Sequence, residues 1–170
     1  MAKKYYLQIK SIGDIQHNDD YLFFAYGNLG YVYNMLNVPD SAMLYAQQAY
    51  AMAVKTQSEN IGWQLLWLAD IELKLHNKNL ALDYYKMAID AIKKSYGESR
   101  ALSKCYWGLA DFYRTYSMND SAIYYAHLSL NTSRGLPYMK GISNASLMLA
   151  AIYDSLHQSD NELKYLKTFI

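Results

Sequence analysis

The chain has 170 residues, of which 52% are hydrophobic and 18% charged, and its 16 basic side chains nearly balance 15 acidic ones. This length and apolar content suffice for a folded core and argue against disorder, while a net charge of +1 argues against a nucleic-acid-binding surface. Two prolines and eight glycines are too few for the many tight turns of a β-sandwich or barrel.

Two sequence landmarks recur about every forty residues. The first is an alanine followed three residues later by a tyrosine, and near the C-terminus Tyr165 keeps the tyrosine alone. The alanine–tyrosine pairs are Ala2/Tyr5, Ala42/Tyr45, Ala81/Tyr84 and Ala122/Tyr125. The second landmark lies between them and reads Leu29-Gly30-x-x-Tyr33, Leu68-Ala69-x-x-Glu72, Leu109-Ala110-x-x-Tyr113 and Leu149-Ala150-x-x-Tyr153. Landmarks that repeat in step predict an array of similar structural units.

The segments that hold these landmarks have the three- and four-residue apolar spacing of helices, and none alternates as a strand does. We expect nine helices, which form one repeat domain over residues 1–170. In chain order they are a half repeat at 1–12 and helix pairs at about 18–57, 58–95, 98–134 and 137–170. Gly135 and Pro137 mark one break, and Ser159 to Glu162 fits a capping box that opens the last helix.

Small residues predict where the two helices of a pair cross, because close approach requires positions without bulk. We expect Gly30 to face Ala42 and Ala69 to face Ala81. The tyrosines at the repeated positions would pack beside these crossings, with the ring inside and the hydroxyl near water. They are Tyr5, Tyr45, Tyr84, Tyr125 and Tyr165 on the second helices and Tyr33, Tyr113 and Tyr153 on the first.

These residues resemble the tetratricopeptide repeat, whose pattern is W-x2-L-G-x2-Y followed by A-x3-F. The best copies are Tyr26-x2-Leu29-Gly30-x2-Tyr33 with Ala42, and Tyr106-x2-Leu109-Ala110-x2-Tyr113 with Ala122. The chain departs from the pattern at Glu72, Ser146 and Glu162, and its period is about forty residues rather than 34. The resemblance implies an all-α, right-handed superhelix of about four helix pairs plus an N-terminal half repeat. It is similar to the long-repeat arrays of bacterial signalling proteins and transcription regulators.

The sequence carries no enzyme signature, and we expect no cofactor and no metal site. The four histidines are far apart, Cys105 has no sequence partner that marks a nucleophile, and the glycines form no phosphate-binding loop. There is also no signal peptide and no apolar run of membrane-spanning length, so we expect this segment to make no membrane contact. The sequence leaves two cellular compartments for this segment: the cytoplasm by default, or the periplasm if the segment belongs to a membrane-anchored sensor.

The resemblance places the first helix of each pair on a concave face, which is the candidate partner-binding surface. The candidate residues there are Phe24, Asn28, Tyr31, Trp63, Trp67, Asp70, Lys104, Asp111 and Arg114. Aromatic anchors beside directed polar groups are typical of peptide recognition. The alternative is that the tryptophans only pack between helices, which we favour for Trp107 and leave open for Trp67.

One family site can be tested on the sequence. Co-chaperone tetratricopeptide domains hold a terminal carboxylate with Lys and Asn, and the corresponding positions here are Gly27, Tyr31, Trp67, Lys104 and Gly108. Only Lys104 has suitable chemistry. We therefore expect the partner to be an internal peptide segment, or another domain of the same polypeptide, and not nucleic acid.

The ends of the chain suggest a second role. The N-terminal helix lacks a preceding partner, and the last helix carries an apolar stripe of Leu163, Tyr165, Leu166, Phe169 and Ile170. Terminal repeats normally have polar caps. We interpret the chain as a piece of a longer protein, and the alternative is a structural spacer that self-associates, as a homodimer, through its terminal helices.

Overall fold

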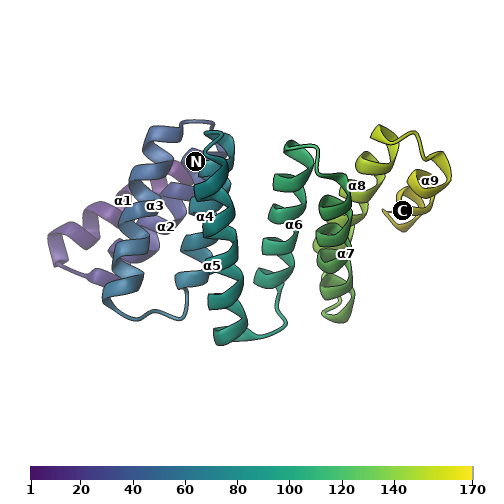
Figure 1. Ribbon diagram of the computed structural model, residues 1–170. Coiled ribbons are helices and arrows are strands. Elements are labelled where there is room, and N and C mark those ends of the chain that lie inside the picture. Colours follow the sequence, from purple (N-terminus) through teal and green to yellow (C-terminus); the bar gives the residue numbers. More distant parts are fainter. Residues whose placement is uncertain (170) are drawn as a thin grey trace. The chain divides into compact units, whose positions relative to one another are not determined.

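The computed structural model describes residues 1–169, with the backbone alone at 168 and 169. Over this range the chain forms nine helices and no strand, which confirms the expected all-α class (Figure 1). The helices are α1 (Ala2–Gln16), α2 (Asp19–Met35), α3 (Pro39–Lys55), α4 (Ile61–Lys74), α5 (Lys78–Tyr96), α6 (Arg100–Thr115), α7 (Asn119–Gly135), α8 (Met139–Ser155) and α9 (Ser159–Phe169).

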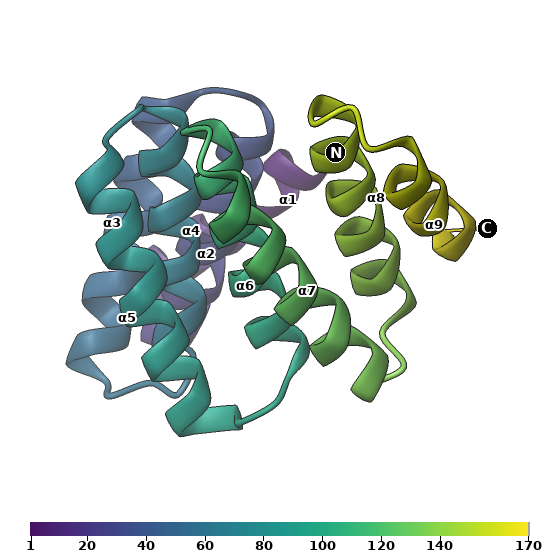
Figure 2. The same ribbon diagram turned by 45° about the vertical axis from the view of Figure 1, so that its right-hand side comes forward.

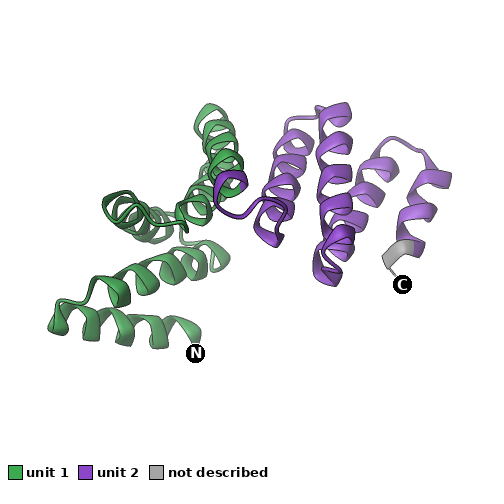
Figure 3. Ribbon diagram, turned by 90° about the horizontal axis from the view of Figure 1, so that it is seen from below, with its two compact units in different colours: residues 1–92 green, residues 93–170 purple. Residues whose placement is uncertain are grey.

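The helices fall into two compact units, residues 1–92 and 93–170, whose boundary lies inside α5 (Figure 3). In unit 1, α1 packs on α2, α2 on α3 and α3 on α4, and α2 also contacts α4. In unit 2, the same holds from α6 to α9, and α6 also contacts α8. Within each unit, therefore, consecutive helices pack as antiparallel neighbours in a solenoid-like arrangement, and the first helices of successive pairs lie side by side.

Most helices end on a residue with left-handed backbone geometry, about twenty residues after the previous one. Only Gly97 among these is a glycine; the others include His17, Asn37, Gln57, His76, Ser117 and His157, with φ between 50° and 60°. The next N–H then bonds back to the last turn, as Val38 does to the Tyr33 carbonyl (3.0 Å) and Met118 to that of Tyr113 (2.9 Å). This is the Schellman arrangement, which reverses the chain within two or three residues.

The tyrosines at the repeated positions stack in pairs across these turns. Tyr33 lies on Tyr45 with ring centroids 5.5 Å apart, Tyr113 on Tyr125 at 5.3 Å, and Tyr153 on Tyr165 at 5.7 Å. The planes of each pair are within 12° of parallel. Each stack joins the first helix to the second helix of one pair, and burial raises the pKa of Tyr125, Tyr153 and Tyr165.

The second pair replaces the first tyrosine of the stack with Glu72. Its side chain is only 6% exposed, and its carboxylate accepts a hydrogen bond from Asn77 Nδ2 at 2.7 Å. Burial and the negative charge of Glu72 both raise the pKa of the Tyr84 hydroxyl, which occupies the other half of the stack position. A hydrogen-bonded carboxylate thus stands where the other pairs have a ring.

The helix crossing at Gly30 differs from the prediction. A Cβ placed on Gly30 would lie 3.1 Å from the backbone nitrogen of Ala46 and 3.4 Å from its Cβ, so Gly30 faces Ala46, one turn beyond Ala42. In an antiparallel pair, residues at similar distances from the turn face one another, and the prediction did not count outward from the turn. The pairing of Ala69 with Ala81 stays a prediction.

The last helix is held in unit 2 by part of its apolar stripe. Tyr165 is buried against the α7–α8 core and Leu166 packs on it, whereas Leu163 is exposed. Figure 2 shows α8 and α9 side by side. The side chains of Phe169 and Ile170 lie outside the described residues. The helix starts at Ser159, and the Gln158 carbonyl accepts the Glu162 N–H, so Ser159 is the first helical residue and not the N-cap of the predicted capping box.

The left-handed helix ends predict that Gln57→Gly stabilises the protein. A side chain with a Cβ is disfavoured in this conformation by about 1–2 kcal/mol, and glycine gives part of that back as extra freedom in the unfolded chain. We expect urea unfolding to show a gain of up to about 1 kcal/mol. Gln47→Gly, at an exposed interior position of α3, is the matched control and should lose about 0.5–1 kcal/mol. A loss in both variants would contradict the assignment.

The crossing of α6 and α7 predicts that Ala110→Leu destabilises the fold. Ala110 and Ala126 correspond to Gly30 and Ala46, and both are completely buried in one cluster. The added methylenes should lower the free energy of unfolding by about 1–3 kcal/mol. Ala151→Leu, on the exposed face of α8, serves as the control and should change it little. An unchanged melting temperature for Ala110→Leu would disprove the close crossing.

His127 predicts a pH dependence of the docking of α9. Burial lowers its pKa, as do the positive charges of Lys164 and Arg134, and its ring meets Tyr165 at 5.7 Å. As the pH falls, His127 therefore binds a proton in the unfolded chain before it does so in the folded chain. Its contribution to the free energy of unfolding is complete above about pH 6.5 and is lost as the pH falls below that value. Unfolding at pH 7.5 and pH 5 should show a larger loss for the wild type than for His127→Gln. Equal losses would contradict this.

Candidate functional site

Four aromatic side chains on α2 and α4 form the aromatic face of unit 1, which we define as Phe24, Tyr31, Trp63 and Trp67. On α2 the two rings are seven residues apart, and on α4 they are four apart, so each pair lies on one side of its helix. Because α2 contacts α4, the two stripes meet. The sequence prediction placed all four residues on one surface, and they do belong to adjoining helices of the same unit.

Three of the four rings of the aromatic face contact one another, and the fourth, Phe24, contacts a ring of α1. Tyr31 and Trp67 have ring centroids 5.9 Å apart, and Trp63 and Trp67 are 6.3 Å apart. At the other end, Phe24 meets Tyr6 of α1 edge-on at 5.8 Å. Phe24 is nevertheless 48% exposed and Tyr31 39% exposed, while the two tryptophans are half-buried. The face therefore presents ring surface to solvent on a supported base.

The absence of a side chain at Gly27 makes room for Trp67. A Cβ at residue 27 would lie 3.0 Å from Cζ3 of Trp67 and 3.3 Å from Oε1 of Gln64, closer than side chains usually approach. The missing side chain lets the tryptophan lie flat between α2 and α4. Trp67 thus packs between helices and also contacts the rings of the aromatic face, and its contact with a partner stays a prediction. Trp107 packs against the core of unit 2, as expected.

The two polar candidates of unit 1 are held by neighbouring groups. Asn28 Nδ2 donates to the Phe24 carbonyl one turn earlier at 2.8 Å, and Asp70 accepts a hydrogen bond from the Tyr85 hydroxyl at 2.7 Å. The Asp70 bond ties α4 to α5, which explains the residue without a ligand.

The remaining candidates, Lys104, Asp111 and Arg114, belong to unit 2. All three lie on α6, and Arg114 contacts Asp111 Oδ1 through Nη2 at 2.6 Å and through Nε at 3.2 Å. An ion pair between residues three apart on a helix surface is worth only a few tenths of a kcal/mol. The predicted nine-residue surface is therefore described as two separate sets, six residues in unit 1 and three in unit 2.

Sequence reasoning missed Gln64 as a site residue. Its side chain is 4% exposed, and its Oε1 has no hydrogen-bond partner among the described residues. Trp67 Nε1, one turn later on α4, is also buried without a partner. The available signal was a glutamine inside the otherwise apolar run from Trp63 to Leu68.

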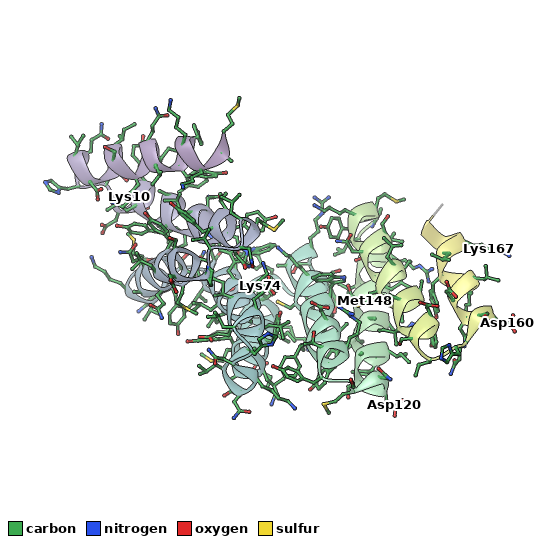
Figure 4. All side chains as sticks on the ribbon, turned by 90° about the horizontal axis from the view of Figure 1, so that it is seen from above. Lys10, Lys74, Asp120, Met148, Asp160 and Lys167 are labelled. Atoms are coloured by element: carbon green, nitrogen blue, oxygen red, sulfur yellow. The ribbon has the colours of Figure 1, made fainter. Side chains whose placement is uncertain are left out.

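A small cleft of about 190 Å³ lies at the C-terminal end of α2. Lys74, labelled in Figure 4, extends there from the end of α4, and its Nζ donates to the Asn34 carbonyl at 2.7 Å. A cation at the end of a helix satisfies the last carbonyls and the helix dipole. The cleft is thereby explained by helix capping and adds no ligand site.

The histidines and the cysteine have places in the helical framework. Three histidines, His17, His76 and His157, occupy left-handed helix ends, and Cys105 is buried. No three His, Cys, Asp or Glu side chains gather as metal ligands within the described part of the chain. In the same part, no helix is both long and apolar enough to cross a bilayer.

No protein-family model matches the chain, and no curated protein matches it. Among solved structures it is similar to BtubC (BKLC) from P. vanneervenii, with a TM-score of 0.75 and 20% sequence identity. The alignment covers 88% of this chain and 62% of BtubC, so the chain spans less than two thirds of that protein's length. At this identity the likeness shows a shared helical fold.

Proposed function

We propose that the chain is a tetratricopeptide-like module that binds a peptide segment of a protein partner through the aromatic face of unit 1. The observation that carries the proposal is the exposure of Phe24 and Tyr31 beside two half-buried tryptophans. Aromatic side chains have few rotatable bonds, so they lose little conformational entropy on binding while they bury large apolar areas. The repeated sequence landmarks and the paired helices support a scaffold role. No sequence feature supports catalysis.

The setting we propose is the regulatory or sensory region of a bacterial signalling protein or transcription regulator. This rests on the long repeat period, which resembles the arrays of such proteins. The partner would be an internal protein segment or another domain of the same polypeptide. Because Lys104 alone has the chemistry of the co-chaperone clamp, recognition of a free C-terminus is not part of the proposal.

A second candidate function is self-association through the terminal helices. Its specific support is α1, where Ile12 and Ile15 are exposed with no helix of the described chain over them, and Leu163 is exposed on α9. Exposed aliphatic residues on end helices are the ordinary route by which repeat arrays associate. Sedimentation at several concentrations separates this candidate from the first, because Ile12→Ser with Ile15→Ser would then abolish the dimer.

The proposed function predicts that peptides selected on this chain depend on the aromatic face. A phage-displayed library of random peptides would be panned on the chain, and the selected peptides resynthesised for titration. We expect Phe24→Ala with Tyr31→Ala to weaken their binding at least about tenfold, as loss of central aromatic anchors does. The melting temperature should fall only modestly, because about half of Phe24 and about two fifths of Tyr31 are already exposed to solvent.

The matched control is Tyr124→Ala, which removes a ring of 59% exposure from α7 in unit 2. Binding should stay within about twofold of the wild type in this variant, since rim or remote contacts carry little energy. Peptides that bind the Phe24/Tyr31 variant as tightly as the wild type would refute the aromatic face as the binding surface.

A further inference from the structure

Two buried polar atoms beneath the aromatic face lack hydrogen-bond partners. Gln64 Oε1 is an acceptor and Trp67 Nε1 is a donor, and neither has a partner in the described part of the chain. Gln64 is more than nine-tenths buried. More than 90% of buried polar groups in proteins are paired, because an unpaired one loses its water without replacement. Two such atoms on one turn of one helix call for a common explanation.

The position of these atoms connects them with the proposed binding surface. Gln64 and Trp67 are three residues apart on α4, and both side chains lie against Gly27 of α2. Gly27 in turn lies between Phe24 and Tyr31 on the same helix face. Gln64 meets the Gly27 position through Oε1, and Trp67 meets it through Cζ3, on the edge of the indole away from Nε1. We call Gln64 Oε1 and Trp67 Nε1, both buried on one turn of α4 where it packs on α2, the polar floor.

We propose that this polar floor binds the main chain of an extended peptide segment, an inference that rests on the proposed function. A peptide main chain offers one N–H donor and one C=O acceptor at each residue, and the floor offers one acceptor and one donor. Gln64 Oε1 accepts from a main-chain N–H of the segment, and Trp67 Nε1 donates to a main-chain carbonyl. The exposed rings of Phe24 and Tyr31 then pack on a bulky apolar side chain of the segment.

The alternative source of these two hydrogen bonds is trapped water. A water needs two to four polar partners, and Gln64 and Trp67 together supply the minimum of two. The aromatic surroundings favour a segment that also buries apolar area. Because both atoms are covered in the unbound chain, the indole of Trp67 turns aside when the segment enters, and its contacts with Tyr31 and Trp63 make that movement visible as a change in tryptophan fluorescence.

The first test uses Gln64→Leu, which keeps the side-chain volume and removes the unpaired amide. If the Gln64 amide is paired only when a peptide is bound, the variant should melt at a higher temperature than the wild type. Its peptide binding should weaken roughly tenfold, which corresponds to the loss of one or two hydrogen bonds. A lower melting temperature with unchanged binding overturns the inference, since it assigns the amide to a water or another structural bond.

The matched control is Gln48→Leu on α3. Gln48 Oε1 is also buried without a partner, but the residue is not on the aromatic face. This variant should bind the selected peptides as tightly as the wild type. Weakening equal to that of Gln64→Leu would show a general effect of the substitution and overturn the inference.

The second test identifies the peptide atom. Synthetic copies of a selected peptide, each N-methylated at one main-chain nitrogen, are titrated against the wild type and Gln64→Leu. One position should weaken wild-type binding about tenfold and leave Gln64→Leu binding unchanged, because the N–H and its acceptor belong to one bond. Losses of equal size in both proteins at every position overturn the inference.

The two proposals fail differently. If the library yields no peptide that needs Phe24 and Tyr31, the proposed function is refuted and the inference falls with it. If peptides need those rings but bind Gln64→Leu as tightly as the wild type, the polar floor alone is refuted and the binding surface stands.

Discussion

The tyrosine stack that joins the two helices of the first, third and fourth pairs is the contact on which those pairs depend. Its two rings are always twelve residues apart in sequence, as in Tyr33 with Tyr45 and Tyr113 with Tyr125, and a left-handed residue lies between them. In these two pairs the carbonyl of the first tyrosine also accepts the hydrogen bond that closes the turn. One residue thus fixes the turn through its backbone and the second helix through its ring, so a short local segment sets the geometry of a whole pair.

This constraint explains which parts of the fold could be predicted. The repeat landmarks predicted the helix pairs because the tyrosines and alanines mark the contacts themselves. The helix ends were harder, since His17, Gln57 and Ser117 take a conformation that sequence reasoning assigns to glycine. The Schellman bonds and the packing of the next helix hold them there against an unfavourable intrinsic preference. The Gly30 crossing was misplaced by one turn because a consensus position says nothing about distance from the turn.

The aromatic residues of the candidate site could be predicted from the sequence, but the buried polar residue beneath them could not. Phe24, Tyr31, Trp63 and Trp67 stand at helical spacing, and the family resemblance predicted their common surface. Gln64 escaped notice because a single polar residue in an apolar run has no periodicity of its own. Its meaning depends on Gly27 of another helix, which removes the bulk that would otherwise cover or displace its amide. Such a relation arises only when two helices are placed together.

The second helix pair departs most from the repeat pattern, and its first helix, α4, supplies Trp63 and Trp67 of the aromatic face. Glu72 replaces a stacking tyrosine with a buried carboxylate held by Asn77, and Gln64 and Trp67 leave polar atoms unpaired on the same helix. Proteins keep such departures where function needs them, because a surface that has satisfied all its own hydrogen bonds has none left to offer a partner.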